Sequence, residues 1–334
     1  MLNPLRRRNH VLPGSVFGFG LVASMWLYSV SVLFGTIGVL LMIFFLYLEL
    51  VTQWSFRAPP RRKPAFKDER FKTHILEVNG HNIAHYISAG RVDKPTVWMC
   101  HGWTSGAYRM GVRAASFLER GWTVILVDLP GHGISDSLRK WTAEETTSLL
   151  IQAFNQLHHA RPELFSSGVV HYGHSMGSFV GLRISHRRSE LNEGIDLLGW
   201  VLESPMTGYS EIFIETCKIL RIPSILRPIV LRKTLRHFNA LNEGVAQFSR
   251  LSDADAPAWG MPQEKALLVQ AMPDERLGSA HYERLIRLME SESQPALLTT
   301  ELLNDLTHSG SHVSPSRKAA VDTWLDEHYS ASSA

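Results

Sequence analysis

The chain has 334 residues, of which 45% are hydrophobic and 19% charged, and its formal net charge is +3. This length suits one large domain with an appendage, and the apolar content is ample for a sizeable core. The net charge is too small to favour nucleic acid as a partner. Its two cysteines, Cys100 and Cys217, cannot form a disulfide framework, and no metal-ligand cluster is visible in the sequence. We therefore expect neither a metal nor a cofactor.

The N-terminal region carries a long apolar stretch. Asp, Glu, Lys and Arg are absent from Val11 to Leu48, and the richest part is a run of about 36 residues from Val16 to Val51. A membrane helix needs about 20 apolar residues. The run therefore predicts either one long tilted helix or a hairpin of two short helices that turns near Gly35-Thr36-Ile37-Gly38. Residues 1–55 are interpreted as a membrane anchor.

Basic residues flank this anchor on both sides, at Arg6 to Arg8 and at Arg57 to Lys67. Positive charge favours the cytoplasmic side of a membrane, so a hairpin with both ends in the cytoplasm accounts for both clusters. A single span would leave one cluster on the wrong side. We therefore prefer the hairpin, with the rest of the protein facing the cytoplasm. Residues 56–70, which are basic and contain prolines, are predicted to be a linker near the lipid headgroups.

From about residue 71 to residue 330 strand and helix patterns alternate. The strand patterns are His74–Val78, Asn82–Ser88, Thr96–Cys100, Thr123–Asp128, Val169–Tyr172, Leu197–Leu202, Ala266–Ala271 and Ala296–Glu301. The helix patterns are Ala107–Glu119, Ala143–His159, Ser178–Arg188, Ala280–Glu290 and Arg317–His328. This alternation predicts an α/β domain with a mostly parallel sheet covered on both faces, opened by a hairpin at Asn79-Gly80.

Residues from about 206 to 262 break the alternation. Ile212–Leu220 and Ile225–Phe238 are apolar but carry several lysines and arginines. Long insertions of this kind usually serve binding, so we expect a helical lid over the site. Its basic and apolar faces could contact a membrane or an acidic substrate, or could be ordinary solvated helix faces.

The most informative motif for function is Gly173-His174-Ser175-Met176-Gly177. It lies between an apolar strand and a helix, which is the context that a G-x-S-x-G nucleophile elbow requires. Such a turn holds the serine in a strained backbone and exposes its hydroxyl at the end of the sheet. It also aims the N-terminus of the following helix at the reaction site. We therefore predict that Ser175 is a nucleophile.

A serine hydroxyl needs a base within hydrogen-bond reach, and the base needs an acid that orients it. In sheets of this kind, active groups gather at the carboxyl ends of strands. Asp274 follows one such strand, and His312 lies in the loop after the last strand. The order Ser175, Asp274, His312 is the order that nucleophile-elbow hydrolases use.

Alternatives remain open for both partners of the serine. His308 lies four residues before His312 and is the alternative base. Glu203 ends the strand before the lid and is the alternative acid, with Glu275 as a weaker candidate. His101, His132 and His174, which stand beside glycines in turns, are interpreted as structural or pocket-lining residues.

Together these motifs resemble those of the alpha/beta-hydrolase superfamily from about residue 71 to residue 328. The likeness is greatest to its monoacylglycerol-lipase-like and serine-aminopeptidase-like branch. The segments that carry it are His101-Gly102-Trp103, Asp128-Leu129-Pro130-Gly131-His132-Gly133, Gly173-His174-Ser175-Met176-Gly177 and the pair Asp274 and His312. The resemblance implies that the backbone N–H groups of Trp103 and Met176 form the oxyanion hole.

Two departures from the family pattern bear on the acid and the base. Ala271-Met272-Pro273 precede Asp274 where a glycine is usual, and Ser311 stands directly before His312 in place of a glycine. The resemblance also argues against two chemistries, since epoxide hydrolases and dehalogenases of this superfamily need an aspartate where Ser175 stands.

The sequence therefore predicts a membrane-anchored serine hydrolase that cleaves a carboxylic ester, with membrane lipids as partners. The substrate is expected to be a lipid, lysolipid or monoacylglycerol ester. An aminopeptidase is a weaker alternative, because related peptidases tend to carry a tryptophan where Met176 stands. Acyl transfer on the same triad, which differs from hydrolysis by the exclusion of water, and an inactive membrane-tethered interaction module are further alternatives. The oligomeric state cannot be read from the sequence.

Overall fold

The computed structural model of the chain describes residues 8–56, 65–291, 297–309 and 313–330. It divides into two compact units. The helical unit consists of Met1–Ala58, Arg139–Trp141 and Ile212–Arg250, and the sheet unit consists of Pro59–Leu138, Thr142–Glu211 and Leu251–Ala334.

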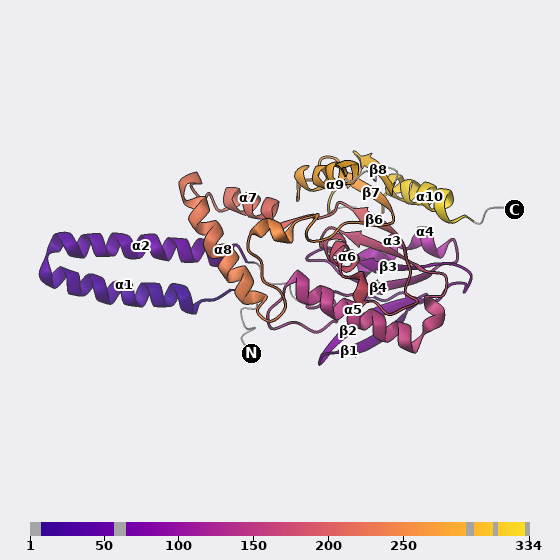
Figure 1. Ribbon diagram of the computed structural model, residues 1–334, viewed down its shortest axis with the longest axis horizontal. Helices are drawn as coiled ribbons and strands as arrows, with labels where there is room; N and C mark the ends of the chain where they lie inside the picture. The colour runs from indigo at the N-terminus through magenta and orange to yellow at the C-terminus, as the bar shows by residue number, and fades with distance from the viewer. Residues whose placement is uncertain (1–7, 57–64, 292–296, 310–312, 331–334) are drawn as a thin grey trace. The chain divides into compact units, whose positions relative to one another are not determined.

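An eight-stranded sheet organises the sheet unit (Figure 1). The strands are β1 Lys72–Val78, β2 His81–Ser88, β3 Thr96–Cys100, β4 Thr123–Val127, β5 Val169–His174, β6 Leu197–Glu203, β7 Lys265–Ala271 and β8 Leu298–Leu303. Their order across the sheet is β1-β2-β4-β3-β5-β6-β7-β8. Strand β2 pairs antiparallel with β1 and with β4, and the other pairs are parallel. The predicted mostly parallel sheet is confirmed.

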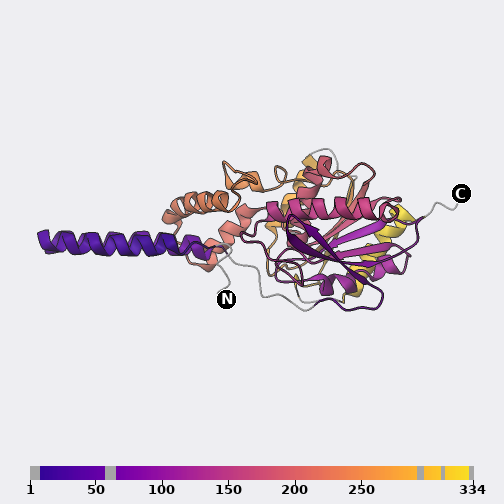
Figure 2. The ribbon, with the colours of Figure 1, turned by 90° about the horizontal axis from the view of Figure 1, so that it is seen from below.

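Helices cover both faces of this sheet (Figures 1 and 2). They are α3 Ala107–Arg113, α4 Ala115–Leu118, α5 Ala143–Ala160, α6 Met176–His186, α9 Ala280–Ser291 and α10 Pro315–Tyr329. Because successive strand residues point to opposite faces, Met99 packs in the core with Met110 of α3 and Trp324 of α10, whereas its neighbour Trp98 stacks on Phe154 of α5. The parallel strands β3 to β7 are therefore buried on both sides, in agreement with the predicted sheet covered on both faces, whereas the edge strand β8 is partly exposed.

Several predicted boundaries differ from the structure by one or more residues, and two of the differences bear on the description below. The helix predicted over Ala107–Glu119 is interrupted at Ala114, which separates α3 from α4. The last strand ends at Leu303, two residues beyond the predicted end at Glu301. This extension matters for the site, because it brings the end of the strand to within five residues of His308.

The helical unit begins with a hairpin of two helices, α1 Val11–Val30 and α2 Val32–Trp54. They lie antiparallel and side by side (Figure 1). The predicted position of the turn is wrong: the chain reverses at Ser31, not at Gly35-Thr36-Ile37-Gly38. Ser31 has an extended backbone, and its hydroxyl oxygen accepts a hydrogen bond from Leu33 N as the N-cap of α2.

The glycines that suggested the turn have another use. A Cβ on Gly35 would lie 2.2 Å from the Tyr28 ring, and one on Gly38 would lie 3.0 Å from the Ser24 side chain. Both contacts cross from α2 to α1. The small residues therefore allow the two helices to approach closely, which is how small residues act between apolar helices.

The rest of the helical unit comes from the predicted lid. Helix α7 covers Tyr209–Ile219 and α8 covers Arg227–Leu241. Within the unit, Leu48 and Val51 of α2 pack in one buried cluster with Cys217 of α7 and Val230 of α8. Part of the predicted lid, Ile212–Arg250, is thus grouped with the N-terminal hairpin.

Candidate active site

Ser175 occupies the sharp turn between β5 and α6. Its backbone has φ 53° and ψ −112°, in a region that a residue with a Cβ rarely adopts. Ser175 N donates to Glu203 O at 3.0 Å, which ties the turn to the end of β6. The residue is 8% exposed. A strained, tightly supported serine at the carboxyl end of a central strand is the geometry of a nucleophile elbow.

Two glycines allow other backbone segments to approach this turn. A Cβ on Gly177 would lie 2.1 Å from Cys100 O, so the first turn of α6 packs directly on the end of β3. A Cβ on Gly102 would lie 3.1 Å from Ser175 Cβ. The Gly102–Trp103 peptide therefore lies beside the serine, and Met176 is the first residue of α6. The oxyanion-hole role of Trp103 N–H and Met176 N–H stays a prediction.

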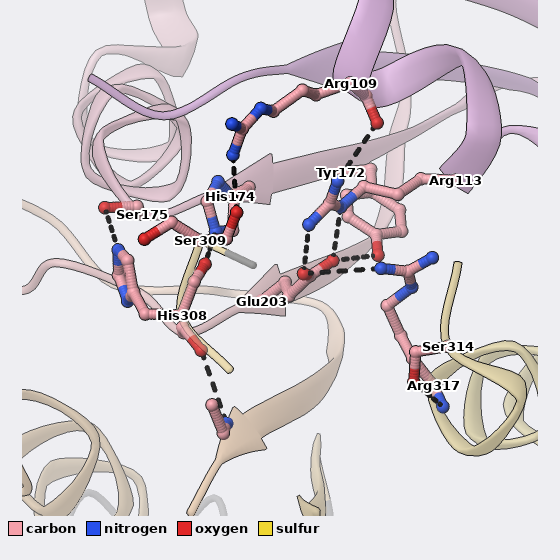
Figure 3. Close-up of polar contacts among 12 residues, drawn as sticks. Arg109, Arg113, Tyr172, His174, Ser175, Glu203, His308, Ser309, Ser314 and Arg317 are labelled. Carbon is pink, nitrogen blue, oxygen red and sulfur yellow. Dashed lines mark hydrogen bonds and ion pairs between the residues drawn. The ribbon is translucent and has the colours of Figure 1, made fainter. Parts of the chain in front are cut away.

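His308 is the histidine that the structure places against Ser175. Its Nε2 lies 3.0 Å from Ser175 Oγ, and its Nδ1 lies 2.8 Å from Asp274 Oδ2. These two contacts put the imidazole between the serine and the carboxylate (Figure 3 shows the side chains of Ser175 and His308). The first choice of the sequence analysis, His312, lies outside the described residues. We therefore replace His312 by its alternative, His308, as the candidate base.

Asp274 is held in an orientation that suits an acid beside histidine. Its Oδ1 accepts hydrogen bonds from the backbone N–H groups of Arg276 and Leu277 at 2.9 and 2.8 Å, which leaves Oδ2 facing His308. Burial by itself raises the pKa of this carboxyl. The hydrogen bond from His308 and those from the backbone outweigh burial, so the pKa lies below its ordinary value. The carboxylate is therefore charged at neutral pH and accepts a hydrogen bond from the Nδ1–H group of His308.

The loop that carries His308 is fixed by three side chains from other segments. His174 Nε2 lies 2.8 Å from His308 O, and Arg109 Nη1 donates to Ser309 O at 2.6 Å (Figure 3). His308 N donates to Glu275 Oε2 at 3.1 Å. We call His174, Arg109 and Glu275 the loop clamp, because they bind consecutive backbone groups of the base and its neighbour.

The hydrogen bond from His174 also defines the state of that ring. A carbonyl oxygen only accepts, so His174 Nε2 carries the proton. Burial, reinforced by the nearby charge of Arg113, lowers the pKa of His174 to about 3. The ring is therefore neutral at physiological pH and acts as a fixed donor.

Glu203, the alternative acid, has different partners. Arg113 donates to its two carboxylate oxygens at 2.7 and 2.5 Å, and Tyr172 OH donates to Oε2 at 2.6 Å (Figure 3). Arg317 adds a second positive charge, 3.7 Å from Oε1. Burial alone raises the pKa of Glu203, but the charge and hydrogen bonds of Arg113 pull it far below its ordinary value. This carboxylate belongs to a buried ion pair and does not contact His308 in the structure.

The remaining turn histidines support loops. His101 Nε2 accepts a hydrogen bond from Leu129 N at 3.0 Å, and His132 Nδ1 lies 3.1 Å from Pro130 O. Burial lowers the pKa of His101 to about 4 and that of His132 to about 3. Both rings are therefore neutral at physiological pH. The structural interpretation of these two histidines fits their contacts.

Sequence reasoning missed the arginines of this region. Arg109 and Arg113 are four residues apart on α3 and so lie on one face of the helix. Two cations at that spacing on a helix with a buried face were a signal for buried acceptors.

Among the described residues, no group of three or more His, Cys, Asp or Glu side chains is arranged to hold a metal ion.

The chain is similar to several known proteins. The family model described as serine aminopeptidase, S33, matches residues 92–252. A curated haloalkane dehalogenase of Mycolicibacterium paratuberculosis is 25% identical over 136 residues, which are 39% of this chain and 43% of the dehalogenase. The chain thus aligns with less than half of that relative's length.

Solved structures share the fold over most of the chain. An esterase of Pyrococcus furiosus is 17% identical with a TM-score of 0.58, over 81% of this chain and 97% of the esterase. A putative hydrolase of Agrobacterium vitis is 19% identical with a TM-score of 0.53, over 78% of this chain and 99% of the other. At these identities the likeness shows the alpha/beta-hydrolase fold, and activity has to be argued from the site.

Proposed function

We propose that this chain, which has the alpha/beta-hydrolase fold, is a serine hydrolase that cleaves a carboxylic ester through Ser175, His308 and Asp274. One observation carries the proposal: a single imidazole lies within hydrogen-bond distance of both the elbow serine and a buried carboxylate. An activated serine requires that arrangement.

The proposed reaction has two stages. His308 Nε2 takes the proton from Ser175 Oγ as the oxygen attacks the ester carbonyl carbon, and Asp274 stabilises the imidazolium that forms. The N–H groups of Trp103 and Met176 donate to the carbonyl oxygen as it gains negative charge. The C–O bond to the alcohol then breaks, His308 gives its proton to the leaving oxygen, and the acyl group stays on Ser175. Water then attacks the acyl carbon while His308 takes its proton. The bond to Ser175 Oγ breaks, His308 returns the proton to Oγ, and the carboxylic acid leaves.

We further propose that the ester belongs to a lipid and that the protein is anchored in a membrane. Helices α1 and α2, of 20 and 23 residues, are long and apolar enough to cross a membrane. Their large apolar side chains, such as Phe19, Trp26 and Leu40, are exposed. A site tethered to a bilayer gains access to bilayer lipids, and the basic flanks of the hairpin favour a cytoplasmic location.

The dehalogenase relative does not favour dehalogenation here. A covalent dehalogenase of this superfamily is expected to use an aspartate at the elbow, where this chain has Ser175. A peptidase is a second candidate, favoured by the description of the matching family model. The same triad would form an acyl-enzyme from a peptide, so the leaving group decides between the two.

The test uses the full chain purified in detergent. Monoacylglycerol, lysophospholipid and aminoacyl-amide substrates are compared for the wild type and for Ser175→Ala. We expect ester hydrolysis that the substitution abolishes, with little activity on the amides. Ester hydrolysis that survives Ser175→Ala would contradict the proposal, and a preference for amides would move it to the peptidase.

A further inference from the structure

The end of α2 is bound firmly to α8. Besides the apolar cluster around Val51 and Val230, Lys233 Nζ forms an ion pair with Glu49, and the Phe56 ring contacts His237 edge-on at a centroid distance of 4.5 Å. Helix α8 runs across the end of the hairpin, not along it (Figure 1). The end of the hairpin opposite the Ser31 turn therefore carries a helix lying crosswise.

The opposite side of α8 and the segment before it expose large apolar side chains. Ile225 is 83% exposed, Ile219 58% and Ile229 44%. Arg232 and Arg236 are exposed and follow Ile229 by three and seven residues, so these three share one face of α8. Ile225 lies in the 3-10 turn Ser224–Leu226 directly before that helix. Isoleucine and arginine on one exposed face are typical of a helix that lies in a membrane interface.

This segment also concentrates positive charge. Residues 212–250 contain seven lysines and arginines and two acidic residues, an excess larger than that of the whole chain. Lys218 pairs with Glu215, and Lys233 pairs with Glu49. Within the described part of the chain, no acidic partner is found for Arg221, Arg232 or Arg236. Their charge is complementary to an anionic surface.

If the hairpin spans a bilayer, its length determines the depth at which α8 lies relative to the headgroups. Helix α2 has 23 residues, which is about 35 Å at the rise of an α-helix, against a hydrocarbon core of about 30 Å. Leu48 to Gln53, where α8 packs, form the last turns of α2 and are largely buried. Those turns therefore reach the headgroups, and α8, which crosses them, lies at the same level.

We propose that Ile219, Arg221, Ile225, Ile229, Arg232 and Arg236 form a lipid-contact face that lies in the headgroup layer of an anionic bilayer. The inference rests on the membrane anchoring in the proposed function. The isoleucines enter the boundary between headgroups and acyl chains, and the arginines bind lipid phosphates. The lid segment is thereby fixed to the surface from which a lipid ester would come.

The test places a fluorophore on this face. Ile225→Cys is labelled with a thiol-reactive NBD dye in the full chain, whose native Cys100 and Cys217 are both buried. The labelled protein is reconstituted into phosphatidylcholine vesicles with and without phosphatidylglycerol, and quenching by aqueous dithionite is measured. Val92→Cys, at a 66% exposed position of the sheet unit, is the reference label.

Charge variants show whether the arginines contribute. The first replaces Arg221, Arg232 and Arg236 by glutamine. Its matched control replaces Lys72, Lys265 and Arg287, three exposed cations of the sheet unit, and removes the same charge. Each arginine near an anionic surface contributes about fivefold to binding. In the first variant the ratio of shielded to exposed label should therefore fall by up to about 10²-fold.

We expect the Ile225→Cys label to be shielded on phosphatidylglycerol vesicles, with the shielding reduced by salt and by the first variant but not by the control. Equal quenching in detergent and on anionic vesicles would overturn the lipid-contact face. Shielding that ignores phosphatidylglycerol would overturn the role of the arginines. Shielding that rises with the number of protein molecules per vesicle would show that a second copy of the chain covers this face, and it would also overturn the lipid-contact face.

Failure of the underlying proposals has a separate signature. If alkaline carbonate extracts the protein from membranes, the anchoring is wrong. If the purified protein shows no esterase activity that depends on Ser175, the hydrolase proposal is wrong. Protein that resists extraction and cleaves esters, but whose label at residue 225 stays in water, contradicts the lipid-contact face alone.

Discussion

Asp274 and Glu203 are two buried carboxylates at the carboxyl ends of neighbouring strands, and their partners give them different roles. Asp274 accepts from an imidazole and two backbone N–H groups, whereas Glu203 accepts from Arg113 and a tyrosine. The pKa of each lies below its ordinary value despite burial. A buried carboxylate beside a permanent cation is neutralised in place, while one beside histidine can respond to proton transfer. The difference lies in the partner and not in the acid.

Removing the charge of Asp274 is expected to have the largest effect. Asp274→Asn leaves His308 without the group that orients its Nδ1–H, and in a serine triad such a change lowers kcat by about 10⁴-fold. Ester hydrolysis by the purified chain measures it. Stability should fall less than activity: Asn keeps an oxygen for the N–H groups of Arg276 and Leu277, but its amide NH2 replaces the oxygen that accepts from Gln270 Nε2 at 3.2 Å. A loss below tenfold would show that Asp274 is not the orienting acid.

The same exchange at Glu203 should act on stability instead. Glu203→Gln leaves the Arg113 guanidinium buried without a countercharge, which typically costs about 3–5 kcal/mol. The midpoint of denaturant unfolding, followed by tryptophan fluorescence, measures this cost. The protein that remains folded should keep a kcat within about tenfold of the wild type. Unchanged stability with a collapse of kcat would reverse the roles assigned to the two carboxylates.

The loop clamp offers a finer test of how the base is positioned. Arg109→Ala and His174→Ala each free one backbone carbonyl at the His308 loop, and misplacement of a catalytic group by about 1 Å can cost about 10²-fold in rate. We expect kcat to fall and KM to change little. Arg109→Lys and His174→Gln, which retain a donor, should recover part of the loss. If the alanine variants alter KM alone, these residues contact substrate and do not position the base.

Acid should affect stability through His174 in a defined direction. The folded pKa is about 3 and the unfolded value about 6.5. As pH falls below 6.5 the unfolded chain binds a proton that the folded chain does not, so the unfolding free energy decreases. Between pH 7 and pH 5 this amounts to about 2 kcal/mol. His174→Gln should lessen that decrease by a similar amount, and an unaltered pH profile of stability would refute the assignment.

The comparison of the two carboxylates also explains what the sequence could and could not predict. The elbow at Ser175 was recognisable because its strand, turn and helix are local patterns. The choice between Glu203 and Asp274 depends on Arg113, which is 90 residues from Glu203 along the chain. Such a partner is set by the packing of α3 on the sheet and is not visible in a motif.

The base shows the same limit. His308 and His312 are four residues apart in the sequence, and either position is compatible with a triad. The structure places His308 at the serine because β8 runs to Leu303 and because the loop clamp comes from three other segments. The hairpin gives a parallel case: Gly35 and Gly38 suggest a turn, but in the structure they serve close packing of α1 and α2, and Ser31 makes the turn.

The most direct measurement is fluorophosphonate labelling of membrane fractions from the wild type, Ser175→Ala, His308→Ala and His312→Ala. The probe reacts only with an activated serine. We predict labelling of the wild type and of His312→Ala, and none of Ser175→Ala or His308→Ala when all four variants are folded at equal amounts. Labelling that survives His308→Ala but is lost in His312→Ala would contradict the site described above.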